Sequence, residues 1–153
     1  MTAPNEPVAL AKFRRVAVKR GLLPGLLQAN RFGDFAVVMA AAALAFEEHR
    51  EYSEAEVNGV LKAWLAGAGA MLATDHVELR RWLVDCGLVT RDGFGRRYTR
   101  APAPEPFAAA VEGLAGVDLA AIARNAWDAD TQARAERKAR WMASQDSIKT
   151  EMR

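Results

Sequence analysis

The order of patterns between Tyr52 and Arg100 is the feature that most constrains how this chain can fold. Two stretches with apolar residues at helical spacing come first, and two short β-favouring stretches follow. The second pair is separated by Asp92-Gly93-Phe94-Gly95. Because Asp-Gly between β-favouring runs is typical of a hairpin turn, the segment predicts a helix, a second helix and a hairpin, in that order.

The first of these helices has a clear beginning. Ser53 is followed by Glu56 three residues later, which predicts a capping box at the helix N-terminus. Apolar residues then recur at helical spacing and predict one buried stripe. The stripe consists of Val57, Val60, Leu61, Trp64 and Leu65.

The second helix is expected at about 75–86, with Thr74 or Asp75 as its cap and Gly87 at its end. Its predicted buried stripe is Leu79, Trp82, Leu83 and Cys86. At about 100° per residue, the outward-facing residues are Val77, Arg80, Arg81 and Val84. The two arginines are suited to a nucleic-acid groove, and the alternative is that they solvate the helix or pair with Asp85, Glu78 or acidic residues elsewhere.

The predicted hairpin, residues 88–100, is strongly basic. Its cations are Arg91, Arg96, Arg97 and Arg100, against the single acid Asp92. These arginines could hold phosphates, or they could be protective charges on an exposed sheet edge. His76 at the start of the preceding helix is expected to make a local hydrogen bond or, alternatively, a phosphate contact.

The fold class that these patterns predict is mainly α with a small β-hairpin, arranged as a winged helix-turn-helix core at residues 34–100. This core includes a helix predicted from Asp34 to His49. Residues 1–33 are predicted to form a basic helix, beginning near Pro7 and stopping at Gly21, and a connection. The proline-spaced segment 101–106 is predicted to be a linker, and residues 107–153 a helical extension.

The composition of the 153 residues argues against several classes of protein. Two histidines and one cysteine, with no glycine-rich nucleotide loop, form no catalytic, metal or cofactor motif, so we expect no enzyme and no cofactor. The most apolar run, Phe35 to Phe46, has 12 residues, whereas a membrane span needs about 20. A lone cysteine and the lack of a signal-peptide pattern favour the cytoplasm.

The stretch from Tyr52 to Arg100 resembles a bacterial winged-helix family, the domain of unknown function 2087. The residues that carry the resemblance include Tyr52-Ser53-Glu54, Glu56-Val57-Asn58, Asp75-His76, Leu79-Arg80-Arg81, Leu83-Val84-Asp85, Gly87-Leu88, Arg91, Arg97 and Tyr98. The resemblance implies a cytoplasmic bacterial protein of the kind described as transcriptional regulators.

Two functions follow as hypotheses. In the first, the chain is a transcriptional regulator that binds double-stranded DNA as a homodimer formed through its C-terminal helices. Its DNA contacts would be His76, Val77, Arg80, Arg81, Arg91, Arg96, Arg97 and Arg100. In the second, the winged helix is a scaffold for binding other proteins through the basic N-terminal helix and the acidic segment 47–56. A small ligand between the C-terminal helices and the core, beside Trp127 or Trp141, is a further hypothesis.

Overall fold

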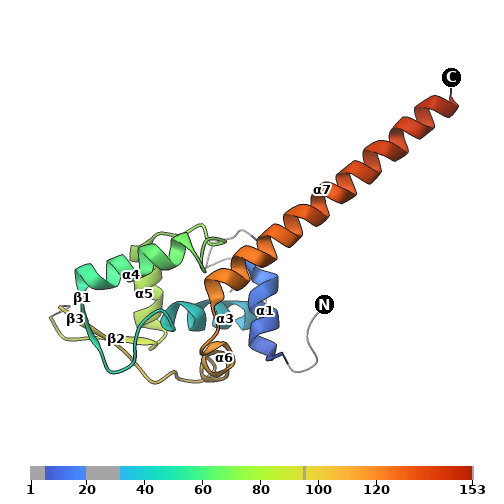
Figure 1. Cartoon of the computed structure of the whole chain (residues 1–153). Coiled ribbons are helices and arrows are strands. Elements are labelled where there is room, and N and C mark those ends of the chain that lie inside the picture. Colours follow the sequence, from blue (N-terminus) through green and yellow to red (C-terminus); the bar gives the residue numbers. More distant parts are fainter. Residues whose placement is uncertain (1–5, 20–31, 95, 153) are drawn as a thin grey trace.

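The structure is a computed structural model that describes residues 6–19, 32–94 and 96–152. Within these residues the chain forms helices around a central helix, with a small sheet at one end and a long helix projecting from the other (Figure 1). The elements are α1 (Val8–Ala17), α3 (Phe32–Ala43), β1 (Glu51–Ser53), α4 (Glu54–Ala66), α5 (His76–Asp85), β2 (Val89–Arg91), β3 (Arg97–Arg100), α6 (Ala108–Leu114) and α7 (Leu119–Glu151). The chain is therefore mainly helical, as predicted, with a small antiparallel sheet.

Helix α3 forms the centre of the core. Every residue from Asp34 to Ala43 is buried, because α1, α5 and α6 all pack against this helix. The alanines at 40–43 let neighbouring backbones approach closely, while Phe35 provides aromatic contacts. Its ring lies 5.4 Å from that of Trp82 on α5 and 6.4 Å from that of Phe107 before α6.

The C-terminus of α3 corrects the sequence prediction. The helix was expected to continue to His49, but it ends at Ala43 and the chain then turns towards β1. In this turn the Tyr52 hydroxyl accepts a hydrogen bond from the Glu47 backbone N–H at 2.8 Å. His49 takes a left-handed backbone conformation, with φ of 61°. The turn reverses the chain so that β1 can join the sheet.

The predicted hairpin is present, and a third strand that the sequence did not reveal pairs with it. The strand order is β1-β3-β2, with both pairs antiparallel. Tyr52 of β1 lies opposite Tyr98 of β3, and both side chains are buried. Strand β1 has only three residues, and its exposed–buried–exposed alternation is too short to distinguish a strand from a loop in the sequence.

The helix boundaries around this sheet follow the predicted capping residues. Ser53 Oγ accepts from the Glu56 backbone N–H at 3.1 Å, and the Glu56 carboxylate accepts from the Ser53 N–H at 3.0 Å. These hydrogen bonds to Ser53, with a smaller contribution from Arg50, lower the pKa of Glu56. Asp75 caps α5, and Gly87 follows α5 with φ of 75°. Local sequence therefore sets both helix starts.

The terminal regions pack together on one side of α3. Pro7 precedes α1 as predicted, whereas the predicted end at Gly21 and the connection that follows lie outside the described residues. Helix α6 packs against both α1 and α3, and the start of α7 packs against α1. Asp118 caps α7 by accepting from the Ala121 backbone N–H at 3.1 Å. Beyond its first turns, α7 extends away from the rest of the molecule (Figure 1).

The capping box makes a testable contribution to stability. We expect Ser53→Ala to lower the free energy of unfolding by about 1 kcal/mol, because the first turn of α4 loses an acceptor for a backbone N–H. Ser144→Ala, on the exposed part of α7, should change the free energy by less than about 0.5 kcal/mol. Urea unfolding of both variants measures the difference, and equal effects would contradict a capping role.

Candidate functional site

The outward face of α5 and the adjacent strand β2 surround one surface hollow of about 280 Å³. Its lining residues are Val77, Arg80, Arg81, Val84, Asp85, Arg91 and Tyr98. Four of the eight predicted contact residues therefore line one hollow, although they come from two different elements. They meet because the sheet packs against the C-terminal end of α5, which leads directly into β2.

Arg80 is held against α4. Its guanidinium donates to Asn58 Oδ1 at 2.7 Å and pairs with Glu54 at 3.1 Å. Only 19% of its side chain is exposed. Arg80 therefore joins α5 to α4 and offers only part of its surface to the hollow. Pairing with a carboxylate outside α5 was one of the alternatives that the sequence left open.

Arg81 and Arg91 are exposed cations of this hollow, and Arg96 is an exposed cation at the hairpin end. Among the residues that the structure describes, none of the three makes a side-chain ion pair. Val77, one turn before Arg81 on α5, is 40% exposed. These side chains are available to a ligand without first breaking an internal interaction.

The two remaining hairpin arginines are engaged within the protein. Arg97 lies on β3 and pairs with Glu51 of the neighbouring strand β1 at 2.8 Å. Arg100 donates to the Phe46 carbonyl at 3.1 Å and approaches Glu48 at 3.4 Å, with 13% of its side chain exposed. Arg100 stabilises the junction between β3 and the turn before β1, whereas the Arg97–Glu51 pair is exposed to solvent, with 67% of the Arg97 side chain accessible. Neither contact could be seen without knowing β1.

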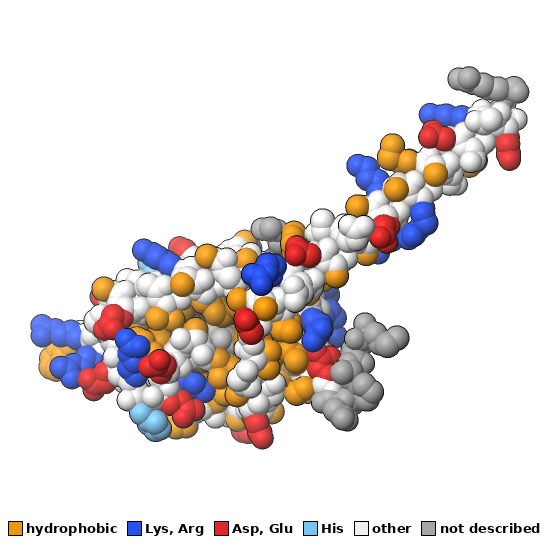
Figure 2. Space-filling view, viewed as in Figure 1, with side chains coloured by type: hydrophobic (Ala, Val, Ile, Leu, Met, Phe, Trp, Pro, Cys, Tyr) orange, Lys and Arg blue, Asp and Glu red, His pale blue; other side chains and the backbone are white. Residues whose placement is uncertain are grey.

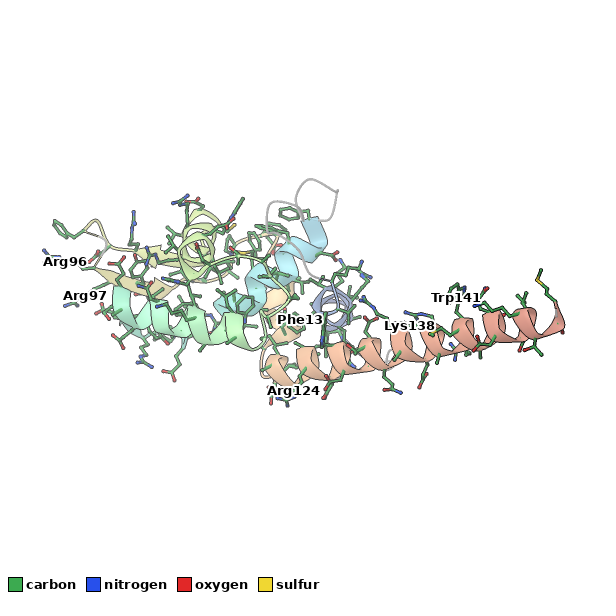
Figure 3. All side chains as sticks on the ribbon, turned by 90° about the horizontal axis from the view of Figure 1, so that it is seen from above. Phe13, Arg96, Arg97, Arg124, Lys138 and Trp141 are labelled. Carbon is green, nitrogen blue, oxygen red and sulfur yellow. The ribbon has the colours of Figure 1, made fainter. Side chains whose placement is uncertain are left out.

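The tip of the hairpin exposes an aromatic ring that the sequence interpretation did not select. Phe94 is 86% exposed. The hairpin is closed by the Asp92 backbone N–H, which donates to the Arg97 carbonyl at 3.0 Å, while the Asp92 carboxylate accepts from the Arg96 N–H at 2.8 Å. Figure 3 shows Arg96 and Arg97 at this end of the molecule. The sequence signal for Phe94 was its position between two turn glycines.

Charge is unevenly distributed around α5. The hollow beside β2 has three arginines against Asp85, whereas a neighbouring hollow on the other side of Arg81 has only that arginine against Asp75, Glu78 and Asp85. Figure 2 shows Lys and Arg side chains gathered at the hairpin end, with acidic side chains among them. A polyanion is therefore favoured on the hairpin side of α5 and disfavoured on the side that carries Asp75, Glu78 and Asp85.

The titratable residues His76 and Cys86 lie at the two ends of α5. His76, the first residue of the helix, is half-buried. Burial, with a smaller contribution from Asp85, raises the pKa of the Cys86 thiol, so that it stays protonated at neutral pH. No group of three or more His, Cys, Asp or Glu side chains that could hold a metal ion occurs within the described residues.

Comparison with known proteins finds a similarity over the region that contains this face. Residues 30–100 match the family described as an uncharacterized protein conserved in bacteria, domain of unknown function 2087. The match begins before Tyr52 and thus includes α3 as well as the sheet, α4 and α5. No curated protein and no solved structure matches the chain. None of the helices in the described ranges is long and apolar enough to cross a membrane.

The different surroundings of the two neighbouring arginines lead to a stability prediction. We expect Arg80→Ala to lower the free energy of unfolding by about 1 kcal/mol, because the bond from α5 to Asn58 is lost. Arg81→Ala should change it by less than about 0.5 kcal/mol, since its side chain is exposed. Chemical denaturation of both variants measures this difference, and equal effects would contradict the role of Arg80.

Proposed function

We propose that this protein is a DNA-binding transcriptional regulator that uses a winged helix-turn-helix. The observation that carries the proposal is a set of exposed arginines that form no ion pair with any described residue. Arg81 and Arg91 line one hollow, and Arg96 lies at the hairpin end (Figure 3). The order α3, β1, α4, α5, β2, β3 is compatible with this fold. Exposed cations on one face of a helix and on the adjacent hairpin suit a phosphate-lined groove.

The proposed contacts divide between α5 and the hairpin. Helix α5 has 10 residues and a length of about 15 Å. Its diameter with side chains, about 10–12 Å for an α-helix, fits a major groove about 12 Å wide. Arg81 and Val77 face outward to read base edges, and His76 lies at the end of the helix that would approach a phosphate. Arg91 and Arg96 bind the backbone beside the groove. Arg80 contributes by holding α5 on α4.

The engaged hairpin arginines have a supporting role in this proposal. Arg97 and Arg100 keep β3 attached to β1 and to the turn after α3, so the hairpin is held at a defined angle to α5. Their pairing with carboxylates reduces the charge that they offer to phosphates. Binding therefore depends more on Arg91 and Arg96 than on Arg97 and Arg100.

The DNA contacts are tested by selecting duplexes from a random library with the full chain at about 100 mM salt. Arg81→Ala should weaken binding to the selected sequence about tenfold and bring it closer to unrelated DNA, because a base contact is lost. Arg91→Ala should weaken binding to every sequence, because a phosphate contact is lost. The slope of log affinity against log salt concentration should fall by about one, which corresponds to one counterion fewer released on binding. Fluorescence anisotropy measures both effects.

Arg137→Ala on α7 is the matched control, since it removes the same charge from a surface far from the hairpin. Its affinity should equal that of the parent. If the selection yields no common sequence and the Arg81 variant binds like the parent, the DNA proposal is overturned. The interpretation as a protein-interaction module would then be favoured.

We further propose that α7 joins two copies of the chain. Its outer half exposes large apolar side chains, with Trp141 64% exposed. At about 100° per residue, Trp141, Gln145, Ile148 and Met152 fall within one narrow stripe. This stripe extends beyond the core, where within the described chain nothing covers it (Figure 3).

Charge favours an antiparallel arrangement of the two helices. The turns before Trp141 carry four cations, Arg134, Arg137, Lys138 and Arg140, against Glu136 and against Asp130, which pairs with Arg134 at 2.7 Å. Parallel pairing would place these cations beside their copies, whereas antiparallel overlap of residues 141–152 keeps the two basic segments apart. Such pairing is two-fold symmetric and places Trp141 beside the partner's Met152. A symmetric dimer suits a pseudo-palindromic DNA site with well-separated halves.

Sedimentation velocity over about 1 to 100 μM protein measures the self-association. The parent should exceed its monomer mass of 16.7 kDa and approach a dimer as concentration rises. Ile148→Glu should remain monomeric, because it places a charge within the apolar stripe. Ala143→Glu, on the opposite face of the same turns, should associate like the parent. A monomeric parent, or equal effects of the two changes, would contradict the arrangement.

A further inference from the structure

A cavity of about 310 Å³ lies where the start of α7 meets α1 and the end of α4. Its lining residues are Ala17, Ala66, Gly67, Ala70, Met71, Ala120, Ala123, Arg124 and Trp127. The space exists because small residues from three elements face one another. A Cβ atom placed on Gly67 would lie only 3.7 Å from Ala120 Cβ, so the helices are in contact beside the cavity.

The four α7 residues of the lining, at positions 120, 123, 124 and 127, follow helical spacing and therefore form one face. Ala120 and Ala123 leave room on this face, while Trp127 and Met71 supply apolar lining. Trp127 thus occupies the position proposed from the sequence, whereas Trp141 lies far along α7 and takes no part (Figure 3).

The charge of the lining determines which ligand it can hold. Arg124 is its only charged residue, and within the described part of the chain Arg124 forms no ion pair. Figure 3 shows it at the start of α7. An arginine binds a carboxylate through paired hydrogen bonds, and the volume lies at the lower end of the about 300 to 1,000 Å³ usual for small-molecule sites.

We propose that this cavity binds a small aromatic carboxylic acid, with its ring between Trp127 and Met71 and its carboxylate on Arg124. The apolar walls exclude a strongly hydrated ligand, and the arginine disfavours a cation. The proposal concerns the α1–α4–α7 junction and does not depend on DNA binding. Because α4 packs against α5, the site is connected to the proposed DNA-reading helix through one helix pair.

The probe for this site is 2-naphthoate, compared with 2-naphthamide, which has the same ring and a neutral head group. Calorimetry should detect binding of one naphthoate per chain, with the amide about tenfold or more weaker because it lacks the charged partner for Arg124. With ¹³C-labelled methionine methyl groups, the Met71 signal should shift on binding, whereas those of the exposed Met142 and Met152 should not.

Three variants locate the interaction. Arg124→Gln should bind the acid and the amide equally, and Arg140→Gln, an equal charge change on the outer part of α7, should keep the preference for the acid. Ala120→Phe should fill the cavity and abolish binding of both compounds. Circular dichroism checks that each variant stays folded, and the Met71 shift in the parent needs no variant at all.

Equal affinity of the parent for acid and amide would overturn the proposed role of Arg124. No Met71 shift at up to about 1 mM naphthoate would overturn the site itself. An unchanged preference for the acid in the Arg124 variant would do so as well, because the charge recognition would lie elsewhere. These measurements contain no DNA, so their failure is distinguishable from failure of the proposed regulatory function.

Discussion

The burial of α3 is the constraint on which the rest of the structure depends. This helix is apolar on every side, so it must be covered on every side to gain the about 1.5 to 3 kcal/mol that each large apolar side chain contributes when buried. Its one buried charged residue, Asp34, pairs with Arg15 of α1 at 3.1 Å. Covering α3 requires α1, α5 and α6 together, which brings both terminal regions to the segment that carries the candidate site.

The third strand decides which hairpin arginines can meet a ligand. Pairing of β1 with β3 places Glu51 beside Arg97, while the turn before β1 brings the Phe46 carbonyl and Glu48 to Arg100. Strand β2 lies at the other edge of the sheet, next to α5, and Arg91 therefore stays exposed. One edge of the hairpin is thus anchored by ion pairs, and the other shares a hollow with Arg81. This division is the physical basis for expecting polyanion binding on one side only.

One side of α7 contacts the core near the start of the helix and is exposed to solvent in its outer half. Near its start, small residues on this side allow contact with the end of α4 and leave the cavity beside Trp127. Further along, the core ends, and the same side carries the exposed stripe that begins at Trp141. A change in how the start of α7 sits would move its outer half by a larger distance, because a helix of 33 residues acts as a lever of about 50 Å. The proposed ligand site and the proposed dimer contact thus share one rigid element.

Local sequence by itself determined the capped starts of α4, α5 and α7, the hairpin turn at Asp92-Gly93 and the predominance of helix, because these depend on contacts within a few residues. Only the tertiary structure decided three other features. The alanine-rich pattern favours helix beyond Ala43, but pairing of β1 requires an earlier turn. The angular position of Arg80 on α5 predicts an outward-facing side chain, but its guanidinium binds Asn58 and Glu54 of α4 and is therefore mostly buried. Whether a hairpin arginine is exposed or paired depends on which strand lies beside it: Arg91 is exposed, whereas Arg97 and Arg100 have partners near β1. The pairing of β1 with β3 joins residues more than 40 positions apart, so it cannot be predicted from local sequence.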